Sequence, residues 1–241
     1  MASSERSESK VRGRLIIALD VAEIETAQHL ADLLDSHVEW FKIGFQLFFQ
    51  PGGPAFVETL KSQGKRVFLD LKLHDIPNTI TAAITALRRF EPDFLTVHAE
   101  RTVVEAARNA VEALKLRTEL LAVTVLTSIT DEDVRQHGFS EPLELLVKNR
   151  ARIAVDAGAH GLVASAREAR MLKKEFPGIV LVTPGIRPAD HRSDDQKRSR
   201  TPGDAIYAGA DYLVIGRPVI QASDPVSVVC DLNRSIINAG L

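Results

Sequence analysis

Charged and titratable side chains alternate with leucines in residues 70–75, directly after the apolar run Val67–Leu69. Residues two apart on a β-strand point to the same side, so Asp70, Lys72 and His74 are predicted to share one face of a strand. A carboxylate and an ammonium group fixed side by side can stabilise charge on a bound molecule or transfer a proton to it. The same pattern also fits a salt-bridged strand on the protein surface, and this segment alone favours neither interpretation.

The next residues predict the end of this strand and the start of a helix. Ile76 and Pro77 interrupt the strand, and Asn78 or Thr79 is expected to act as the N-cap of the helix. Charges at a strand end are unsuited to a hydrophobic core, because burying them unpaired is costly. The position suits a binding or catalytic site better.

Composition excludes several classes of partner. The chain has 241 residues, of which 45% are hydrophobic and 26% charged, as in ordinary globular proteins. Its formal net charge of -2 gives no field that would favour nucleic acid or an anionic membrane. The single cysteine, Cys230, excludes an internal disulfide and fits a reducing cytosol. We therefore expect a cytoplasmic protein with no nucleic-acid or membrane partner.

Residues 1–13 are rich in Ser, Glu, Lys and Arg and contain no apolar stretch of the signal-peptide type, so they are predicted to be a disordered tail. After them, short apolar runs alternate with amphipathic segments. Strands are expected at residues 15–19, 38–43, 66–71, 94–97, 120–125, 161–164, 180–182 and 212–215. Helices are expected at residues 22–34, 53–63, 79–90, 102–116, 142–157, 166–175, 202–208 and 225–237, with a further short helix after residue 129.

The strands are continuous apolar runs, which is typical of a parallel sheet buried on both faces. Eight strand–helix repeats over residues 14–241 predict a single-domain α/β fold, the TIM (β/α)8 barrel. The alternative is an open doubly wound sheet, but no Gly-x-Gly-x-x-Gly turn follows the first strand.

Catalytic side chains of such barrels come from the carboxyl ends of the strands. Polar residues stand at these ends along the whole chain: Asp20, Lys42, Asp70, Lys72, Asp75, His98, Thr127, Ser165, Thr183 to Arg187, and Gly216 with Arg217. Taken singly, Asp20 or Lys42 also fits a solvated loop residue or a helix cap, and His98 fits a hydrogen-bonded packing residue. Converging on one rim, the acidic and basic groups can pair with each other.

The last two strand ends predict a phosphate site. Loops after strands seven and eight of TIM barrels often bind phosphate. Gly216 permits close approach of the backbone to a ligand, and Arg187 and Arg217 can add bidentate contacts. The long segment 183–201 is expected to be a lid or a binding loop. The residues thus predict a phosphorylated small molecule whose reacting part faces the Asp/Lys cluster.

The segment from Asp70 to Pro77 closely resembles the signature of the orotidine 5′-monophosphate decarboxylase family, in its short bacterial form. The resemblance extends in order to Ile17-Ala18-Leu19-Asp20, Phe41-Lys42-Ile43-Gly44, Leu126-Thr127-Ser128, Val182 to Arg187, Asp195-Gln196 with Thr201-Pro202, and Val214-Ile215-Gly216-Arg217. It covers essentially the whole chain after Gly13.

The resemblance implies conversion of orotidine 5′-monophosphate to UMP and CO2 without metal or cofactor, by a homodimer with shared active sites. It implies that Lys72 protonates C6 of the substrate and that Asp70 lies beside the departing carboxylate. Lys42 and Asp75 complete the charged network, with Asp75 coming from the partner subunit.

The remaining implied roles concern substrate binding. Asp20 and Lys42 would contact the ribose, Thr79 would join from the subunit interface, and Thr127 would lie near the base. Arg187 and Gln196 would belong to the closing loop, and Gly216 and Arg217 would hold the phosphate.

Three other interpretations compete. Related sugar-phosphate decarboxylases and aldolase-like synthases use a similar Asp-x-Lys-x-x-Asp strand with a divalent metal, although Lys42 disfavours a cation at the second strand end. A Schiff-base aldolase would need Lys72 as a neutral amine, whereas neighbouring carboxylates favour its ammonium form. The third is a non-catalytic module that binds a phosphorylated ligand.

Overall fold

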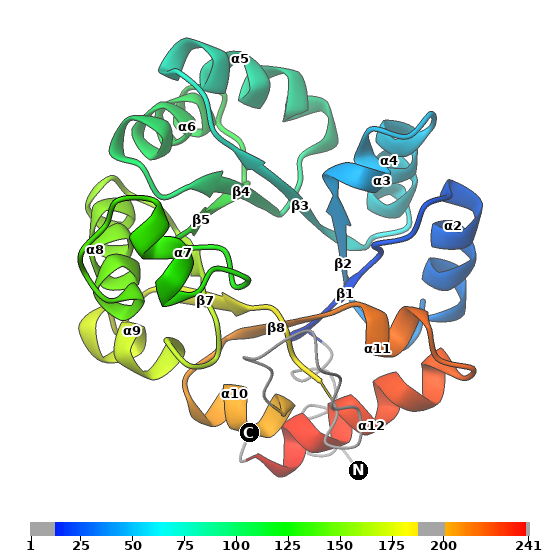
Figure 1. Cartoon of the computed structure of the whole chain (residues 1–241). Coiled ribbons are helices and arrows are strands. Elements are labelled where there is room, and N and C mark those ends of the chain that lie inside the picture. Colours follow the sequence, from blue (N-terminus) through cyan, green and yellow to red (C-terminus); the bar gives the residue numbers. More distant parts are fainter. Residues whose placement is uncertain (1–12, 188–200, 240–241) are drawn as a thin grey trace.

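The computed structural model describes residues 13–187 and 201–239. Within them eight parallel strands follow one another around a closed barrel, and β8 pairs with β1. Figure 1 shows the strands in the middle and the helices around them. The predicted TIM barrel is confirmed, and the closed ring excludes an open sheet. The predicted tail and most of the predicted lid, including Gln196, lie outside the described residues.

The strand and helix bounds agree with the expected rhythm to within a few residues. The strands are β1 Leu15–Ala18, β2 Trp40–Gly44, β3 Arg66–Leu73, β4 Phe94–His98, β5 Glu119–Val123, β6 Gly161–Val163, β7 Val180–Thr183 and β8 Tyr212–Ile215. The main helices are α2 Ile24–Leu33, α4 Gly53–Ser62, α5 Pro77–Leu87, α6 Arg101–Ala113, α8 Leu143–Asp156, α9 Ala169–Glu175, α10 Pro202–Tyr207 and α12 Pro225–Asn238. Shorter ones are α3 Phe45–Phe48, η1 Arg88–Phe90, α7 Asp131–Gln136 and α11 Arg217–Ile220.

The start of α5 corrects one prediction. Ile76, with extended backbone angles, is the N-cap, and Pro77 occupies the first turn. Proline favours an extended residue before it and is suited to the first helical position. Asn78 and Thr79 therefore lie inside the helix and do not cap it.

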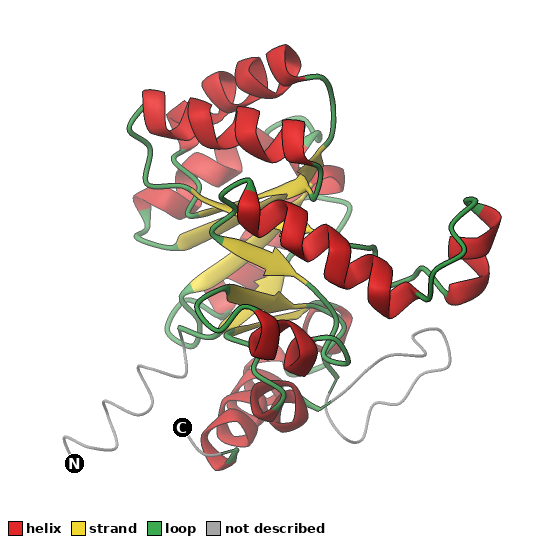
Figure 2. Cartoon of the chain, turned by 90° about the vertical axis from the view of Figure 1, so that its left-hand side faces the viewer, coloured by secondary structure: helices red, strands yellow, loops and turns green. Residues whose placement is uncertain are grey.

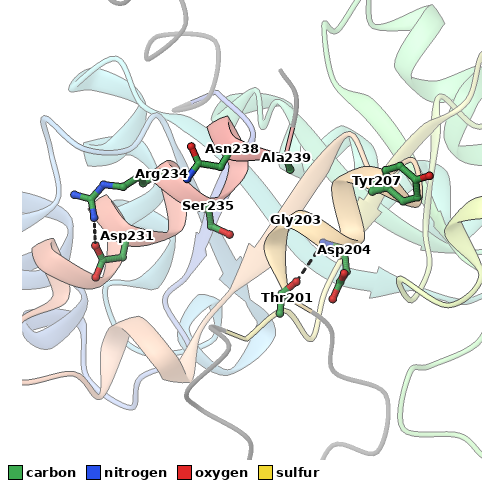
Figure 3. Close-up of a pocket in the computed structure, with 9 residues that line it drawn as sticks. All are labelled: Thr201, Gly203, Asp204, Tyr207, Asp231, Arg234, Ser235, Asn238 and Ala239. Atoms are coloured by element: carbon green, nitrogen blue, oxygen red, sulfur yellow. Dashed lines mark hydrogen bonds and ion pairs between the residues drawn. The ribbon is translucent and has the colours of Figure 1, made fainter.

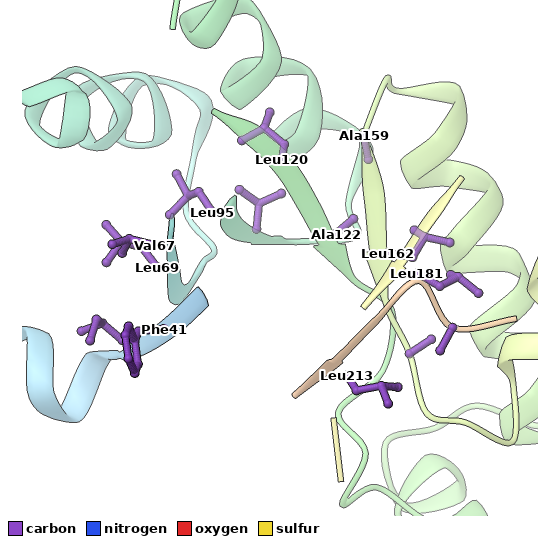
Figure 4. Packing of buried hydrophobic residues seen from close by; sticks show 14 of the residues in the cluster. Phe41, Val67, Leu69, Leu95, Leu120, Ala122, Ala159, Leu162, Leu181 and Leu213 are labelled. Carbon is purple, nitrogen blue, oxygen red and sulfur yellow. The ribbon is translucent and has the colours of Figure 1, made fainter. Parts of the chain in front are cut away.

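Alternate strand residues pack into two apolar layers. The larger layer lies between the strands and the surrounding helices, and Figure 4 shows part of it, including Phe41, Leu95 and Leu162. Figure 2 shows the strands from the side, with helices flanking them. The smaller layer fills the barrel, as expected for this fold.

Aromatic rings close the interior of the barrel. The rings of Trp40 and Phe94 stack with centroids 4.3 Å apart, and the Tyr212 ring meets Phe94 edge-on at 5.1 Å. The Arg66 guanidinium lies 4.4 Å from the centre of the Trp40 ring. The barrel is therefore a packed core on which a site at the carboxyl ends of the strands can rest.

Candidate active site

Alternate residues of the strands face the inside of the barrel, and near the carboxyl ends of the strands some of these residues are charged. Trp40 and Phe68 belong to the interior layer. Lys42 follows Trp40 by two residues on β2, and Asp70 follows Phe68 by two residues on β3. Because residues two apart share a face of a strand, both charged side chains point to the inside of the barrel, above the apolar layer.

Four of these groups form a chain of ion pairs, here called the charged array: Asp20, Lys42, Asp70 and Lys72. Lys42 Nζ lies 2.8 Å from Asp20 Oδ1 and 3.6 Å from Asp70 Oδ2. Lys72 Nζ lies 2.8 Å from the same Asp70 Oδ2. Each charge thus has an opposite charge beside it, which offsets the cost of burying the array.

Asp70 is the central anion of the array, with only 15% of its side chain exposed. Burial by itself would raise the pKa of Asp70. The ammonium groups of Lys42 and Lys72, together with hydrogen bonds from Lys72 and Thr96, outweigh burial and hold this pKa below its ordinary value. Asp70 therefore stays ionised at neutral pH and presents a negative charge next to the Lys72 ammonium.

The backbone around Lys72 departs from the regular strand that the sequence pattern predicts. The pairing of β3 with β4 shifts between Leu69 and Leu73, and Lys72 has a φ of 45°. This left-handed conformation is uncommon for a residue other than glycine. The predicted shared face therefore does not continue regularly to His74.

Two glycines lie beside the array, and one of them, Gly44, leaves space for its ion pair. A Cβ atom on Gly44 would lie 3.2 Å from Asp20 Oδ1 and 3.3 Å from Lys42 Nζ. A Cβ atom on Gly216 would lie 3.4 Å from the Cβ of Ala18. Gly44 ends β2 inside the matched segment Phe41–Gly44, and its role follows from the distances to the ion pair.

His74 lies in a second group beside the array. Its Nε2 is 3.0 Å from Glu100 Oε1, and its ring centroid is 4.7 Å from that of His98. Burial, followed by electrostatic interaction with His74 and Arg150, lowers the pKa of His98. These contacts agree with the interpretation that His74 orients the turn after β3 and His98 packs.

Asp75 and Thr79 are exposed on the loop and first turn that follow β3. Asp75 Oδ1 accepts a hydrogen bond from the backbone N–H of Ile76 at 2.7 Å. Within the described part of the chain, no ion pair joins Asp75 to the array. Within the single chain, the array and Asp75 are therefore separate features.

The other predicted residues lie at further strand ends. Thr127 lies in a turn after β5, Arg187 follows β7, and Gly216 and Arg217 join β8 to α11. Ser165, after β6, is 2% exposed and its hydroxyl has no hydrogen-bond partner among the described residues. All four loops open at the same end of the barrel as the array.

Comparison with known proteins identifies the family. A family model for orotidine 5′-phosphate decarboxylase / HUMPS proteins matches residues 13–231. The chain belongs to this family.

Curated relatives and solved structures extend the likeness over nearly the full length. An orotidine 5′-phosphate decarboxylase of Afipia carboxidovorans is 47% identical over 217 residues, covering 90% of this chain and 91% of the relative. One from Rhodopseudomonas palustris is 45% identical over 231 residues, covering 95% and 97%. The solved structure of the Lactobacillus acidophilus orotidine 5′-phosphate decarboxylase matches with a TM-score of 0.80 and 33% identity, covering 93% of this chain and 99% of that one.

In this member of the orotidine 5′-phosphate decarboxylase / HUMPS family, a lysine lies among the carboxylates at the rim of the barrel. The Lys42 ammonium lies between the carboxylates of Asp20 and Asp70. Among the described residues, no group of three or more His, Cys, Asp or Glu side chains is arranged to hold a metal ion. The donor set at the rim does not fit a divalent cation, because the central position already holds a positive charge.

Among the residues that the structure describes, none of the helices has the length and apolar character needed to span a membrane.

A separate open groove lies on the outside of this family member, between α10 and the end of α12 (Figure 3). Its polar lining includes Thr201, Asp204, Tyr207 and Asn238. The array, in contrast, is carried by the ends of β1, β2 and β3. The groove is therefore not part of the candidate active site.

Proposed function

We propose that this chain is an orotidine 5′-phosphate decarboxylase, a carboxy-lyase that converts orotidine 5′-monophosphate to UMP and CO2 in pyrimidine biosynthesis. Family membership and relatives of that name support the assignment. The observation that carries it is the charged array, in which Asp70 and the Lys72 ammonium lie 2.8 Å apart at the open end of the barrel. We also propose that the enzyme needs no metal or cofactor and works in the cytoplasm.

In the proposed reaction, Lys72 is the general acid. The bond between C6 and the carboxylate breaks, the electron pair stays on C6, and CO2 leaves. The Lys72 ammonium stabilises the developing charge, then gives its proton to C6 and regains one from solvent. The Lys72 side chain is 29% exposed, so a ligand can reach it.

Asp70 has a second proposed effect, on the bound substrate. Its carboxylate would face the substrate carboxylate, and two like charges about 4 Å apart repel by about 4 kcal/mol at an effective dielectric near 20. Enzymes lower barriers by roughly 8–23 kcal/mol, so relief of this repulsion supplies only part of the effect. Stabilisation of the carbanion-like transition state by Lys72 supplies most of the rest.

The remaining residues are proposed to bind the substrate outside the reacting carbon. Asp20 and Lys42 bind the ribose hydroxyls, and Thr127 contacts the base. Gly216 and Arg217 bind the phosphate, and Arg187 and Gln196 contribute from the closing loop. The position of Gly216 next to Ala18 supports this division, because it brings the proposed phosphate loop close to the ribose-binding end of β1.

The active enzyme is proposed to be a homodimer in which Asp75 and Thr79 serve the neighbouring subunit's site. Both residues are exposed, and loops at the same end of the barrel carry large exposed apolar side chains. Ile76 is 66% exposed and Phe49, next to α3, is 76% exposed. Exposed apolar surface of this kind is typical of an interface. A second subunit would cover this surface, and the Asp75 of each subunit would then reach the array of the other.

The assay that tests the activity follows the loss of orotidine 5′-monophosphate by ultraviolet absorbance, before and after dialysis against a chelator. We expect equal decarboxylation rates in both samples. Loss of activity after dialysis, with recovery on adding a divalent cation, would instead support a metal-dependent sugar-phosphate enzyme. Absence of any decarboxylation would contradict the proposed function.

Subunit mixing tests the shared site. Lys72→Ala and Asp75→Asn homodimers are each expected to be inactive. A mixed dimer places both changes in one site and leaves the other site wild-type, so mixing should restore activity. If labelled subunits exchange and activity does not return, Asp75 acts within its own subunit or not at all.

A further inference from the structure

Thr96 is a buried polar residue of β4 that the sequence pattern did not single out. It is fully buried and follows Phe94 of the interior layer by two residues, so it faces the inside of the barrel. Its hydroxyl donates a hydrogen bond to Asp70 Oδ1 at 3.0 Å and accepts one from the backbone N–H of Lys72 at 2.9 Å. One side chain thus contacts both residues of the array that lie on β3, Asp70 and Lys72.

The hydrogen bond to Lys72 stabilises an irregular stretch of β3. Leu69 pairs with Leu95 and Leu73 pairs with Val97, so β3 advances four residues while β4 advances two. Thr96 is the residue of β4 that faces this bulge. A backbone N–H inside a bulge loses its regular partner on the neighbouring strand. The Thr96 hydroxyl replaces that partner at Lys72, whose φ of 45° is the unusual angle of the bulge.

The hydrogen bond to Asp70 fixes the rotation of its carboxylate. With Oδ1 held by Thr96, Oδ2 is the oxygen that faces both ammonium groups, at 2.8 Å from Lys72 and 3.6 Å from Lys42. A hydroxyl has a single proton to donate. Since the proton goes to Asp70, a lone pair of the hydroxyl oxygen accepts the hydrogen bond from the Lys72 N–H. The orientation of one hydroxyl group thus serves both hydrogen bonds.

We propose that Thr96 is a positioning residue, which sets the Lys72 ammonium and the Asp70 carboxylate in the geometry required for reaction. This inference rests on the proposed roles of Lys72 and Asp70. Thr96 acts through these two residues. Removing its hydroxyl leaves the Lys72 N–H without its acceptor and frees the Asp70 carboxylate to rotate. The Lys72 ammonium and the Asp70 carboxylate are then no longer held in the positions required for proton transfer.

The test compares Thr96→Val, which keeps the shape and removes the hydroxyl, with Thr96→Ser, which keeps the hydroxyl. Thr124→Val is the matched control, because Thr124 is equally buried after the neighbouring strand β5 and its hydroxyl bonds the Val163 carbonyl at 3.3 Å. We expect Thr96→Val to lower kcat by about 100-fold, as misplacement of a reacting group by about 1 Å can do, with little change in KM. Thr96→Ser and Thr124→Val should keep most of the wild-type kcat.

The pH profile separates positioning from a general loss of structure. The Thr96 hydrogen bond lowers the pKa of Asp70, so in Thr96→Val the acid limb of kcat should move to higher pH. It should stay in place in Thr124→Val. If Thr96→Val does not fold, Thr96→Ala compared with Thr96→Ser gives the same contrast in the hydroxyl.

A wild-type kcat in Thr96→Val would overturn the inference. So would a fall in kcat of the same size in Thr124→Val, or a kcat in Thr96→Ser that is as low as in Thr96→Val. The proposed function is tested separately by Lys72→Ala. An inactive Lys72→Ala beside a fully active Thr96→Val would refute the role of Thr96 alone. An active Lys72→Ala would refute the proposed reaction itself.

Discussion

Replacing Asp70 by asparagine removes the central negative charge of the array and nearly preserves its shape. In the wild-type protein, the Asp70 carboxylate lies 2.8 Å from the Lys72 ammonium and 3.6 Å from that of Lys42. At an effective dielectric near 20, these distances correspond to gross attractions of about 6 and about 5 kcal/mol. The Asp70→Asn protein keeps both ammonium groups and loses both attractions.

The net change is smaller than the gross attraction, because the carboxylate no longer has to be desolvated. Removing one partner of a buried ion pair typically costs about 3–5 kcal/mol. Lys42 keeps Asp20 as a partner, and the Lys72 side chain is 29% exposed, so water can solvate part of the unpaired charge. We therefore expect the free energy of unfolding at pH 7 to fall by about 3 kcal/mol, at the lower end of that range.

Urea denaturation at one fixed protomer concentration measures this change, with the fluorescence of the single tryptophan as the signal. Trp40 is fully buried among the aromatic rings of the interior, so its emission reports on the barrel core. Glu132→Gln is the control, because it removes a carboxylate from an exposed ion pair with Arg135 and should change stability far less.

The stability difference between the wild-type protein and Asp70→Asn should depend on pH. The folded-state pKa of Asp70 is below its ordinary value of 3.8, so its ionised form stabilises the folded protein above that pH. As the pH falls through 3.8 and then through the folded-state pKa, this stabilisation is lost. The gap between wild-type and Asp70→Asn should therefore narrow below about pH 4. An Asp70→Asn protein that equals or exceeds wild-type stability at pH 7 would show that the attractions do not outweigh the desolvation of the array.

Two further predictions concern the ligand and the histidine pair. Arg217→Ala should raise KM for orotidine 5′-monophosphate roughly 10- to 100-fold, because a hydrogen bond to a charged group contributes about 1.5–3 kcal/mol; unchanged KM and kcat/KM would contradict the phosphate role. NMR titration should place the pKa of His98 below 6.5, since burial and nearby positive groups disfavour its imidazolium form. Its contribution to stability should then be present above pH 6.5 and decrease as the pH falls, and a His98 midpoint at or above 6.5 would contradict this account.

The barrel could be predicted from the sequence because its signal is local. Each apolar strand is followed by a helix with its own periodicity, and eight repeats leave few alternative folds. The four-residue helix α3, Phe45–Phe48, cannot be predicted from the sequence, since a run this short shows no period that separates helix from loop. The side chains of Asn78 and Thr79 predict the cap of α5 two or three residues too late, because the backbone preference of Pro77 sets the cap at Ile76.

The candidate site was predictable where it depends on the two-residue period of a strand. That period places Lys42 and Asp70 above the interior layer and identifies the rim on which they meet. The role of Thr96 depends on the shifted register between β3 and β4, and it contacts Asp70 across 26 residues of chain. The sequence around Thr96 or Asp70 does not show how β3 and β4 are paired. The conformation of Lys72 escaped prediction for the same reason.

The most direct test of the account is turnover of orotidine 5′-monophosphate by Lys72→Ala. Lys148→Ala is the control, since Lys148 pairs with Glu175 on the outer helices. Both proteins should show the wild-type circular dichroism spectrum. We predict that Lys72→Ala produces no measurable UMP while Lys148→Ala retains the wild-type rate. Substantial UMP formation by folded Lys72→Ala would contradict the assignment of Lys72 as the group that stabilises and protonates C6.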